Sequence, residues 1–224
     1  MQFGRVGRML AILFIVVLIS GCLNASEGGG VQSNVTQTTS TSSLQLVFPD
    51  NVSFKAVLEV FQNGTLIANY SYVGEINYTL RSAMVRLSVV YNPENKHLTG
   101  NWHYKKILVE NGSLVKIFNV PPASWSVVPK NQSAGIIEEI FSDNPYRSLF
   151  DALNGGGIPN AGNISVKLAV NQTVALLSPL MWGNQAPEIQ MEGWVLVKGD
   201  KIVEAHLFGM SGMRKYVFNL EVVG

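Results

Sequence analysis

The chain has 224 residues, of which 47% are hydrophobic and 14% charged, with 16 Lys and Arg against 15 Asp and Glu. Nothing in this near-neutral balance suggests nucleic-acid binding, which depends on a concentrated basic surface. Cys22 is the single cysteine, so an intrachain disulfide and a cysteine pair for zinc or redox chemistry are excluded.

The first 21 residues have the pattern of a secretory signal peptide. Arg5 and Arg8 precede an apolar run over residues 9–19, which is shorter than the roughly 20 residues that span a bilayer. The run ends in the letters LISGC, which resemble the lipobox of prokaryotic lipoproteins, where the cysteine is acylated. We therefore predict a signal peptide over residues 1–21 and a lipid anchor at Cys22, on the extracytoplasmic face of a cell membrane. A plain signal peptide or an anchor helix is the alternative.

The next segment is rich in Gly, Ser, Thr, Asn and Gln, and Glu27 is its one charge. Such a composition cannot bury a core. We expect residues 22–43 to form a flexible tether with a reach of roughly 25 Å. A single β-rich extracytoplasmic domain should then occupy residues 44–224.

Asn-X-Ser/Thr sequons occur ten times, where chance would give about two. This excess favours N-glycosylation, although Asn and Ser/Thr also gather in turns and on outward strand positions. A lipobox combined with glycosylated sequons indicates an archaeal cell surface. Two sequons, at Asn24 and Asn34, lie in the tether. The candidates in the domain are Asn51, Asn63, Asn69, Asn77, Asn111, Asn131, Asn163 and Asn171.

Two-residue alternation of apolar and polar side chains dominates the domain and predicts half-buried strands. Asn63-Gly64, Asn111-Gly112 and Gly199-Asp200 favour tight hairpins, so neighbouring strands should be antiparallel. Strands are expected near residues 52–62, 65–73, 79–91, 100–109, 114–119, 164–170, 174–180, 189–198, 201–208 and 214–223.

The period changes to that of a helix between residues 132 and 154. Ile137, Ile140 and Phe141 share one helical face. A second helix is expected over residues 145–153, capped by Asp143 or Asn144 and ended by the glycines 155–157.

The expected elements do not bury each other completely. One face of about ten strands covers on the order of 1,250 Å². Two helices of about ten residues cover only roughly 300 Å². The sheet must therefore curl, split into a sandwich or hold a hydrophobic ligand.

The order of these elements resembles the LolA/LppX-type lipoprotein carriers over residues 52–224. A hairpin over 107–118 precedes a proline-rich link with Trp125, then helices over 132–153, then long strands. The resemblance implies a mainly β (α+β) fold, a strongly curved half-barrel with two short helices on its concave face. It also implies a cavity for acyl chains. The chain departs from such proteins at residues 44–62, which read as strand where they often carry a helix.

No residue pattern predicts a catalytic site, a metal site or a cofactor. His97, His103 and His206 have no neighbour at metal-ligand spacing. No Gly-x-Ser-x-Gly motif occurs. A surface hydrolase whose site is assembled from scattered residues, with His103 or His206 among them, stays the least favoured alternative.

Apolar side chains are the remaining candidates for a binding site. We expect a lipid or another hydrophobic ligand to lie in a cavity between sheet and helices, although ordinary core packing would use the same residues. A glycosylated adhesion or scaffold protein with a filled core is the competing hypothesis. The candidate cavity residues are Trp125, Ile137, Phe141, Leu149, Phe150, Leu177, Met181 and Trp182.

Overall fold

The computed structural model describes residues 44–91, 103–119, 123–155, 160–181 and 184–223. The chain divides into two units, 1–39 and 40–224, and every described element belongs to the second. The expected signal peptide, Cys22, the tether, His97 and Trp182 all lie outside the described residues.

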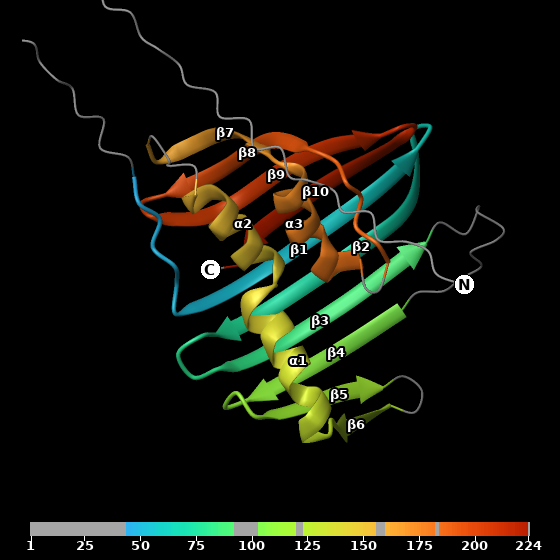
Figure 1. The fold of residues 1–224 in the computed structure, drawn as a ribbon, viewed down its shortest axis with the longest axis vertical. Coiled ribbons are helices and arrows are strands. Elements are labelled where there is room, and N and C mark those ends of the chain that lie inside the picture. Colours follow the sequence, from blue (N-terminus) through green and yellow to red (C-terminus); the bar gives the residue numbers. More distant parts are fainter. Residues whose placement is uncertain (1–43, 92–102, 120–122, 156–159, 182–183, 224) are drawn as a thin grey trace, which may run out of the picture. The chain divides into compact units, whose positions relative to one another are not determined.

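The described residues form one antiparallel sheet of ten strands in the order β6-β5-β4-β3-β2-β1-β10-β9-β8-β7 (Figure 1). The first strand pairs with the last, and β6 and β7 are the two edges. The strands are β1 Asn51–Gln62, β2 Thr65–Asn77, β3 Ser82–Tyr91, β4 His103–Glu110, β5 Leu114–Asn119, β6 Ser124–Val127, β7 Gly162–Leu168, β8 Met191–Lys198, β9 Lys201–Ser211 and β10 Arg214–Val222.

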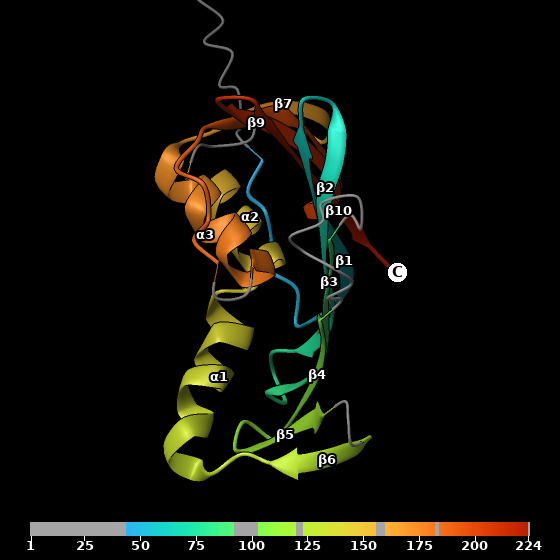
Figure 2. The ribbon, with the colours of Figure 1, turned by 90° about the vertical axis from the view of Figure 1, so that its right-hand side faces the viewer.

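Both ends of the sheet curl toward the side that carries the helices (Figure 2). The sheet is open and strongly curved, so the predicted half-barrel of about ten antiparallel strands is confirmed. Helix α1 lies against β5, whereas α2 and α3 lie against β1 and β2. The helices are α1 Lys130–Ser142, α2 Pro145–Asn154 and α3 Val170–Met181.

The alternation expected from the sequence sets the two faces of the sheet. In β1, Phe54, Ala56 and Leu58 point to the helices and are buried, whereas Lys55 is exposed on the outer face. Cross-strand register continues each face, since Ala56 lies opposite Tyr72 on one side and Leu220 on the other. The concave face is therefore apolar from strand to strand.

The hairpins form where Asn-Gly pairs predict them. Asn63 and Gly64 have φ of 50° and 81°, and Asn111 and Gly112 have φ of 51° and 61°. Positive φ at both central residues defines the turn whose twist matches paired strands. Gly199, with φ of 62°, closes the predicted hairpin between β8 and β9.

Three sequence expectations are corrected. Residues 174–180 belong to the helix α3 and not to a strand, so three helices cover the sheet in place of two. The run Val174–Leu180 is apolar on most sides, and periodicity alone does not separate a buried helix from a buried strand. The first strand begins at Asn51, so residues 44–50 are not strand. The expected link around Trp125 contains the short strand β6.

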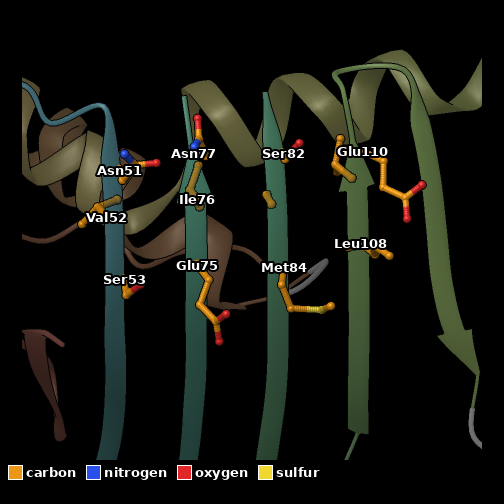
Figure 3. Close-up of a pocket in the computed structure, with 12 residues that line it drawn as sticks. Asn51, Val52, Ser53, Glu75, Ile76, Asn77, Ser82, Met84, Leu108 and Glu110 are labelled. Atoms are coloured by element: carbon orange, nitrogen blue, oxygen red, sulfur yellow. The ribbon is translucent and has the colours of Figure 1, made fainter. Parts of the chain in front are cut away.

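The outer face of the sheet carries shallow clefts. One of about 340 Å³ crosses the ends of β1 to β4 and is lined on the outside by polar and apolar side chains (Figure 3). The labelled side chains among these include Ser53, Glu75, Met84, Leu108 and Glu110. This cleft faces away from the helices and is separate from the predicted interior site.

Candidate ligand-binding interface between the helices and the sheet

The concave face and the helices meet in an apolar layer. Leu149 of α2 and Leu176 and Leu177 of α3 are fully buried against it, as are Leu58 and Phe218 of the sheet. Fully buried apolar side chains pack closely and leave few voids in protein interiors. The layer is thus a packed interface, held mainly by contacts that have no preferred direction.

Aromatic rings concentrate where α1 passes into α2. Phe54 stacks on Tyr72 with ring centres 5.5 Å apart and 10° between the planes, and its centre is 5.8 Å from that of Tyr146. Phe48 lies 4.6 Å from Tyr78 and 4.9 Å from Phe150. The guanidinium of Arg147 lies over the Phe48 ring, 4.4 Å from its centre.

Gly74 makes room for the stacked pair. A Cβ at this position would lie 2.9 Å from Phe54 Cε1 and 3.1 Å from Tyr72 Cε1. Contacts below 3.0 Å do not occur between real side chains, so a larger residue would separate the rings. The glycine therefore fixes the position of the Tyr72 ring on the concave face.

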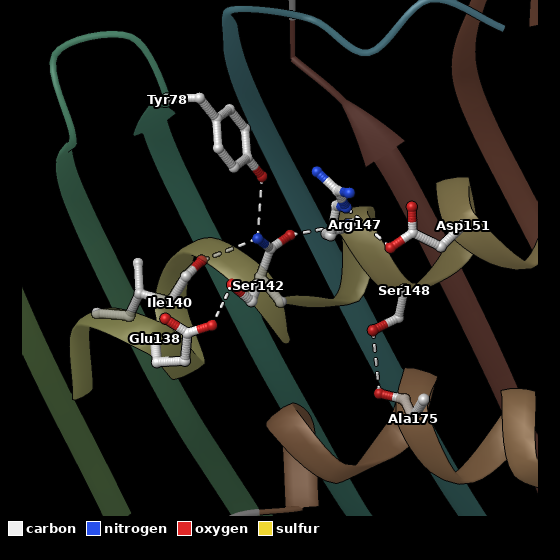
Figure 4. Close-up of polar contacts among 9 residues, drawn as sticks. Tyr78, Glu138, Ile140, Ser142, Arg147, Ser148, Asp151 and Ala175 are labelled. Carbon is white, nitrogen blue, oxygen red and sulfur yellow. Dashed lines mark hydrogen bonds and ion pairs between the residues drawn. The ribbon is translucent and has the colours of Figure 1, made fainter. Parts of the chain in front are cut away.

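Asn144, between α1 and α2, joins both helices to Tyr78, the residue that follows β2. Figure 4 labels its three partners, Tyr78, Ile140 and Arg147. Its side chain caps α2 by accepting from the Arg147 N–H at 2.9 Å, as the sequence predicted. Its amide group donates to the Tyr78 hydroxyl at 2.9 Å and to the Ile140 carbonyl at 2.8 Å. Burial raises the pKa of Tyr78 to about 12, although the bond from Asn144 acts in the opposite direction.

Helices α2 and α3 are joined by a hydrogen bond to the backbone carbonyl that Pro179 leaves without its usual donor in α3. Pro179 has no N–H and cannot donate to the carbonyl of Ala175 one turn earlier. The hydroxyl of Ser148, on α2, donates to that carbonyl at 3.1 Å. The two helices therefore form a pair (Figure 4).

Two buried hydroxyls in this layer have no hydrogen-bond partner among the described residues. They are Tyr72 Oη and Thr173 Oγ1, on side chains that are 3% and 0% exposed. Burial raises the pKa of Tyr72 well above its ordinary value, with smaller contributions from Tyr78 and Glu139. Tyr72 is therefore protonated at neutral pH and offers a donor that nothing described accepts. An unmade buried hydrogen bond costs about 1–3 kcal/mol.

Most of the predicted cavity residues come together in this layer. Ile137, Phe141, Leu149, Phe150, Leu177 and Met181 are all buried in one core. The prediction that Trp125 lines the cavity is wrong. Trp125 lies on the outer face, where it pairs with Phe118 across β5 and β6 and is 42% exposed. Sequence reasoning missed Tyr72 and Thr173. The one signal for Tyr72 was a hydroxyl-bearing ring within the apolar alternation of β2.

The contact between His206 and Asn219 does not resemble a catalytic pair. His206 Nδ1 lies 2.6 Å from Asn219 Oδ1 on the outer face, and its ring stacks on Trp194 at 6.0 Å. His103 occupies the first position of β4, opposite Val89. Within the described ranges, no group of three His, Cys, Asp or Glu side chains could hold a metal ion.

The eight candidate sequons of the domain lie at accessible positions. Asn69 and Asn77 are half-buried, and Asn77 Oδ1 accepts from the Leu80 N–H at 2.6 Å. The exposed ones are Asn51, Asn63, Asn111, Asn131, Asn163 and Asn171. Glycosylation at these positions stays a prediction.

No protein-family model matches the chain, and no curated protein matches it. Among solved structures, the chain is similar to a LolA superfamily protein of Nitrosomonas europaea, with 9% identity and a TM-score of 0.26. The match covers 81% of this chain and 89% of the other. The likeness expected from the order of elements is thus found, as a weak one that concerns the fold alone. Among the helices of the described residues, none is long and apolar enough to cross a membrane.

Proposed function

We propose that this protein binds a lipid or another amphipathic molecule between its helices and the concave face of the sheet. The observation that carries the proposal is the buried hydroxyl of Tyr72, which faces an apolar layer and donates to no described acceptor. An ester, carboxylate or phosphate oxygen of an amphiphile would accept this hydrogen bond. The hydrocarbon part of the amphiphile would take the place of apolar contacts between the helices and the concave face.

For a ligand to replace these contacts, a helix must move away from the sheet. The candidate is α1, because its Glu139 is close enough to contribute to the raised pKa of Tyr72 and because the start of this helix is weakly fixed. Pro129 supplies no side-chain cap, no acidic residue lies in the first turn, and Gly135 lies inside the helix. Each of these features weakens a helix. Each methylene of the ligand that leaves water contributes about 0.8 kcal/mol, which offsets the loss of contacts to α1.

The test uses the protein from Ser40 to Gly224, which contains every described element of the fold. It is incubated with palmitate or with phosphatidylglycerol and examined by native mass spectrometry. We expect a bound mass that solvent extraction releases as intact lipid. A protein that stays free of ligand with both probes would contradict the proposal.

Tyr72→Phe should change affinity and stability in opposite directions. Loss of the donor is expected to weaken lipid binding roughly five- to tenfold, because one hydrogen bond is removed. The ligand-free protein should be as stable as the parent or more so, since an unpaired buried hydroxyl is gone. Titration with a fluorescent fatty acid and thermal unfolding measure the two effects. Thr173→Val is the matched control, and it should leave the affinity within about twofold.

We also propose that Cys22 carries the lipid anchor and that residues 1–21 are its signal peptide, which places the domain at an extracytoplasmic, archaeal cell surface. The lipobox and the sequons support this. In the native host, Cys22→Ala should move the protein from the membrane fraction to the medium or keep it as uncleaved precursor. An unchanged mature mass on membranes would contradict it.

A surface-docking or scaffold function is the second candidate. The clefts on the outer face and the packed helix–sheet layer favour it. A ligand-free protein in the lipid experiment would shift the choice to this function.

A further inference from the structure

The segment that leads into β1, residues 44–50, lies against the interior layer although it is not one of the ten strands. Its side chains alternate, since Leu46 is buried and Phe48 half-buried, whereas Val47 is 52% exposed. Leu46 belongs to the core, and Leu44 and Phe48 pack against it. Figure 2 shows the segment in blue between α2 and the strands. The segment thus directs one apolar side toward the space between the helices and the sheet.

Phe48 lies in the aromatic group that adjoins the proposed ligand site. Its ring centre is 6.2 Å from that of Tyr146. Tyr146 in turn adjoins Phe54, the ring that stacks on Tyr72. Phe48 also meets Phe150 of α2 edge-on, with ring centres 4.9 Å apart. A side chain from outside the sheet and the helices therefore fills space that is one ring away from the stacked pair.

Hydrogen bonds fix the segment at its end, next to β1. The Asp50 carbonyl accepts from the Tyr78 N–H at 2.8 Å, and the Asp50 carboxylate accepts from the Thr79 hydroxyl at 3.2 Å. Farther from β1, the Val47 N–H donates to the carbonyl of Asp200, in the turn between β8 and β9, at 3.0 Å. The residues before Asp50 can therefore leave the interior without breaking the pairing of any of the ten strands.

We propose that Leu46 and Phe48 occupy the place of the ligand's hydrocarbon, and that an acyl chain displaces them when it binds. This inference rests on the proposed function and names the part of the site that receives the chain. The two side chains contain about 11 carbon atoms, and hydrophobic burial follows the apolar area removed from water. A longer acyl chain gains more burial than the segment loses, so the site should select long chains over short ones.

Phe48 also marks where the site opens toward solvent. Its ring is half-buried, and the Arg147 guanidinium above it is paired with the exposed Asp151 at 2.8 Å. Departure of the ring would open a route beside α2 from the surface to the aromatic group. Movement of α1 would still be needed to bring an acceptor to the Tyr72 hydroxyl. The segment therefore controls access for the hydrocarbon, and α1 controls access for the polar group.

The direct test follows hydrogen exchange in the protein from Ser40 to Gly224, with and without palmitate. Bound ligands usually slow exchange, whereas displacement should speed it at least about tenfold in peptides that contain Val47, because its N–H loses the bond to Asp200. Exchange in β1 should stay the same or become slower. Octanoate, which has fewer carbons than the two side chains, should leave exchange at Val47 unchanged at the same concentration.

Two variants weaken the internal competitor. Phe48→Ala should raise the affinity for palmitate roughly tenfold and Leu46→Ala roughly fivefold, because less of the protein is held in the occupied state. Leu207→Ala is the matched control, since Leu207 is fully buried on the concave face of β9, opposite Phe218, and lies outside the segment. It should destabilise the fold and change the affinity less than about twofold.

The outcomes separate displacement from binding itself. Palmitate binding with unchanged or slower exchange at Val47 would overturn the proposal and leave the ligand site intact. Equal gains in affinity for Phe48→Ala and Leu207→Ala would overturn it as well, because any cavity in the core would then serve. A parent protein that binds no palmitate would contradict the ligand site, and displacement together with it.

Discussion

Replacing Gly193 with alanine is expected to prevent stable pairing of β8 with β9. A Cβ on Gly193 would lie 2.0 Å from the carbonyl oxygen of His206 and 3.0 Å from the Cα of Leu207. Both neighbours are backbone atoms of the paired strand, so no side chain can rotate away. The strands would have to separate, and β7 is attached to the sheet only through β8. We expect a loss on the order of 3–5 kcal/mol in the free energy of unfolding, or an insoluble protein.

The measurement is urea unfolding followed by circular dichroism, with Gly135→Ala as the matched control. No atom lies within 4 Å of a Cβ built on Gly135, which occupies the middle of α1. Alanine there should stabilise the protein by about 0.5–1 kcal/mol, because glycine is unfavourable inside helices. If Gly193→Ala unfolds within about 1 kcal/mol of the parent, the close approach of the two strands is not as described.

The strands and hairpins could be predicted because local sequence specifies them. Alternation marks a strand with one buried face, and the Asn63-Gly64 and Asn111-Gly112 pairs adopt the positive φ that hairpins need. Helix α3 could not be identified in this way, because its apolar residues leave little polar contrast. A weak signal was present, since Gln172 reaches back to accept from the Ala169 N–H at 2.9 Å, which is half of a capping box.

The candidate site likewise contains residues that local sequence identifies and others that depend on strand pairing or on the whole interior. Helical spacing identified Ile137, Phe141 and Leu149 as interior residues, because the buried stripe of a helix is a local property. The face on which Trp125 lies depends on its register with Phe118, which is set by pairing between strands. The unpaired state of the Tyr72 hydroxyl is a property of the whole interior, so no sequence pattern carries it.

Replacing Asn144 with alanine should destabilise the protein more than removal of an ordinary helix cap. The side chain is fully buried and makes three hydrogen bonds, to Arg147 N–H, the Tyr78 hydroxyl and the Ile140 carbonyl. Loss of the cap costs about 0.5–2 kcal/mol. The Tyr78 and Ile140 groups would in addition lose a partner, at about 1–3 kcal/mol for a buried polar group. We expect a total loss of about 3 kcal/mol in the free energy of unfolding, measured by urea denaturation.

Two further variants separate the cap from the link to the sheet. Tyr78→Phe removes only the partner on the sheet side and should cost about 1 kcal/mol. Ser142→Ala removes an exposed bond to Glu138 and should cost less than about 0.5 kcal/mol. A double variant of Asn144→Ala and Tyr78→Phe should lose less than the sum of the single losses, because the two residues share one bond. Additive losses would mean that Asn144 stabilises the protein through the cap and the Ile140 carbonyl and not through Tyr78, and that the helices are joined to the sheet by apolar contacts.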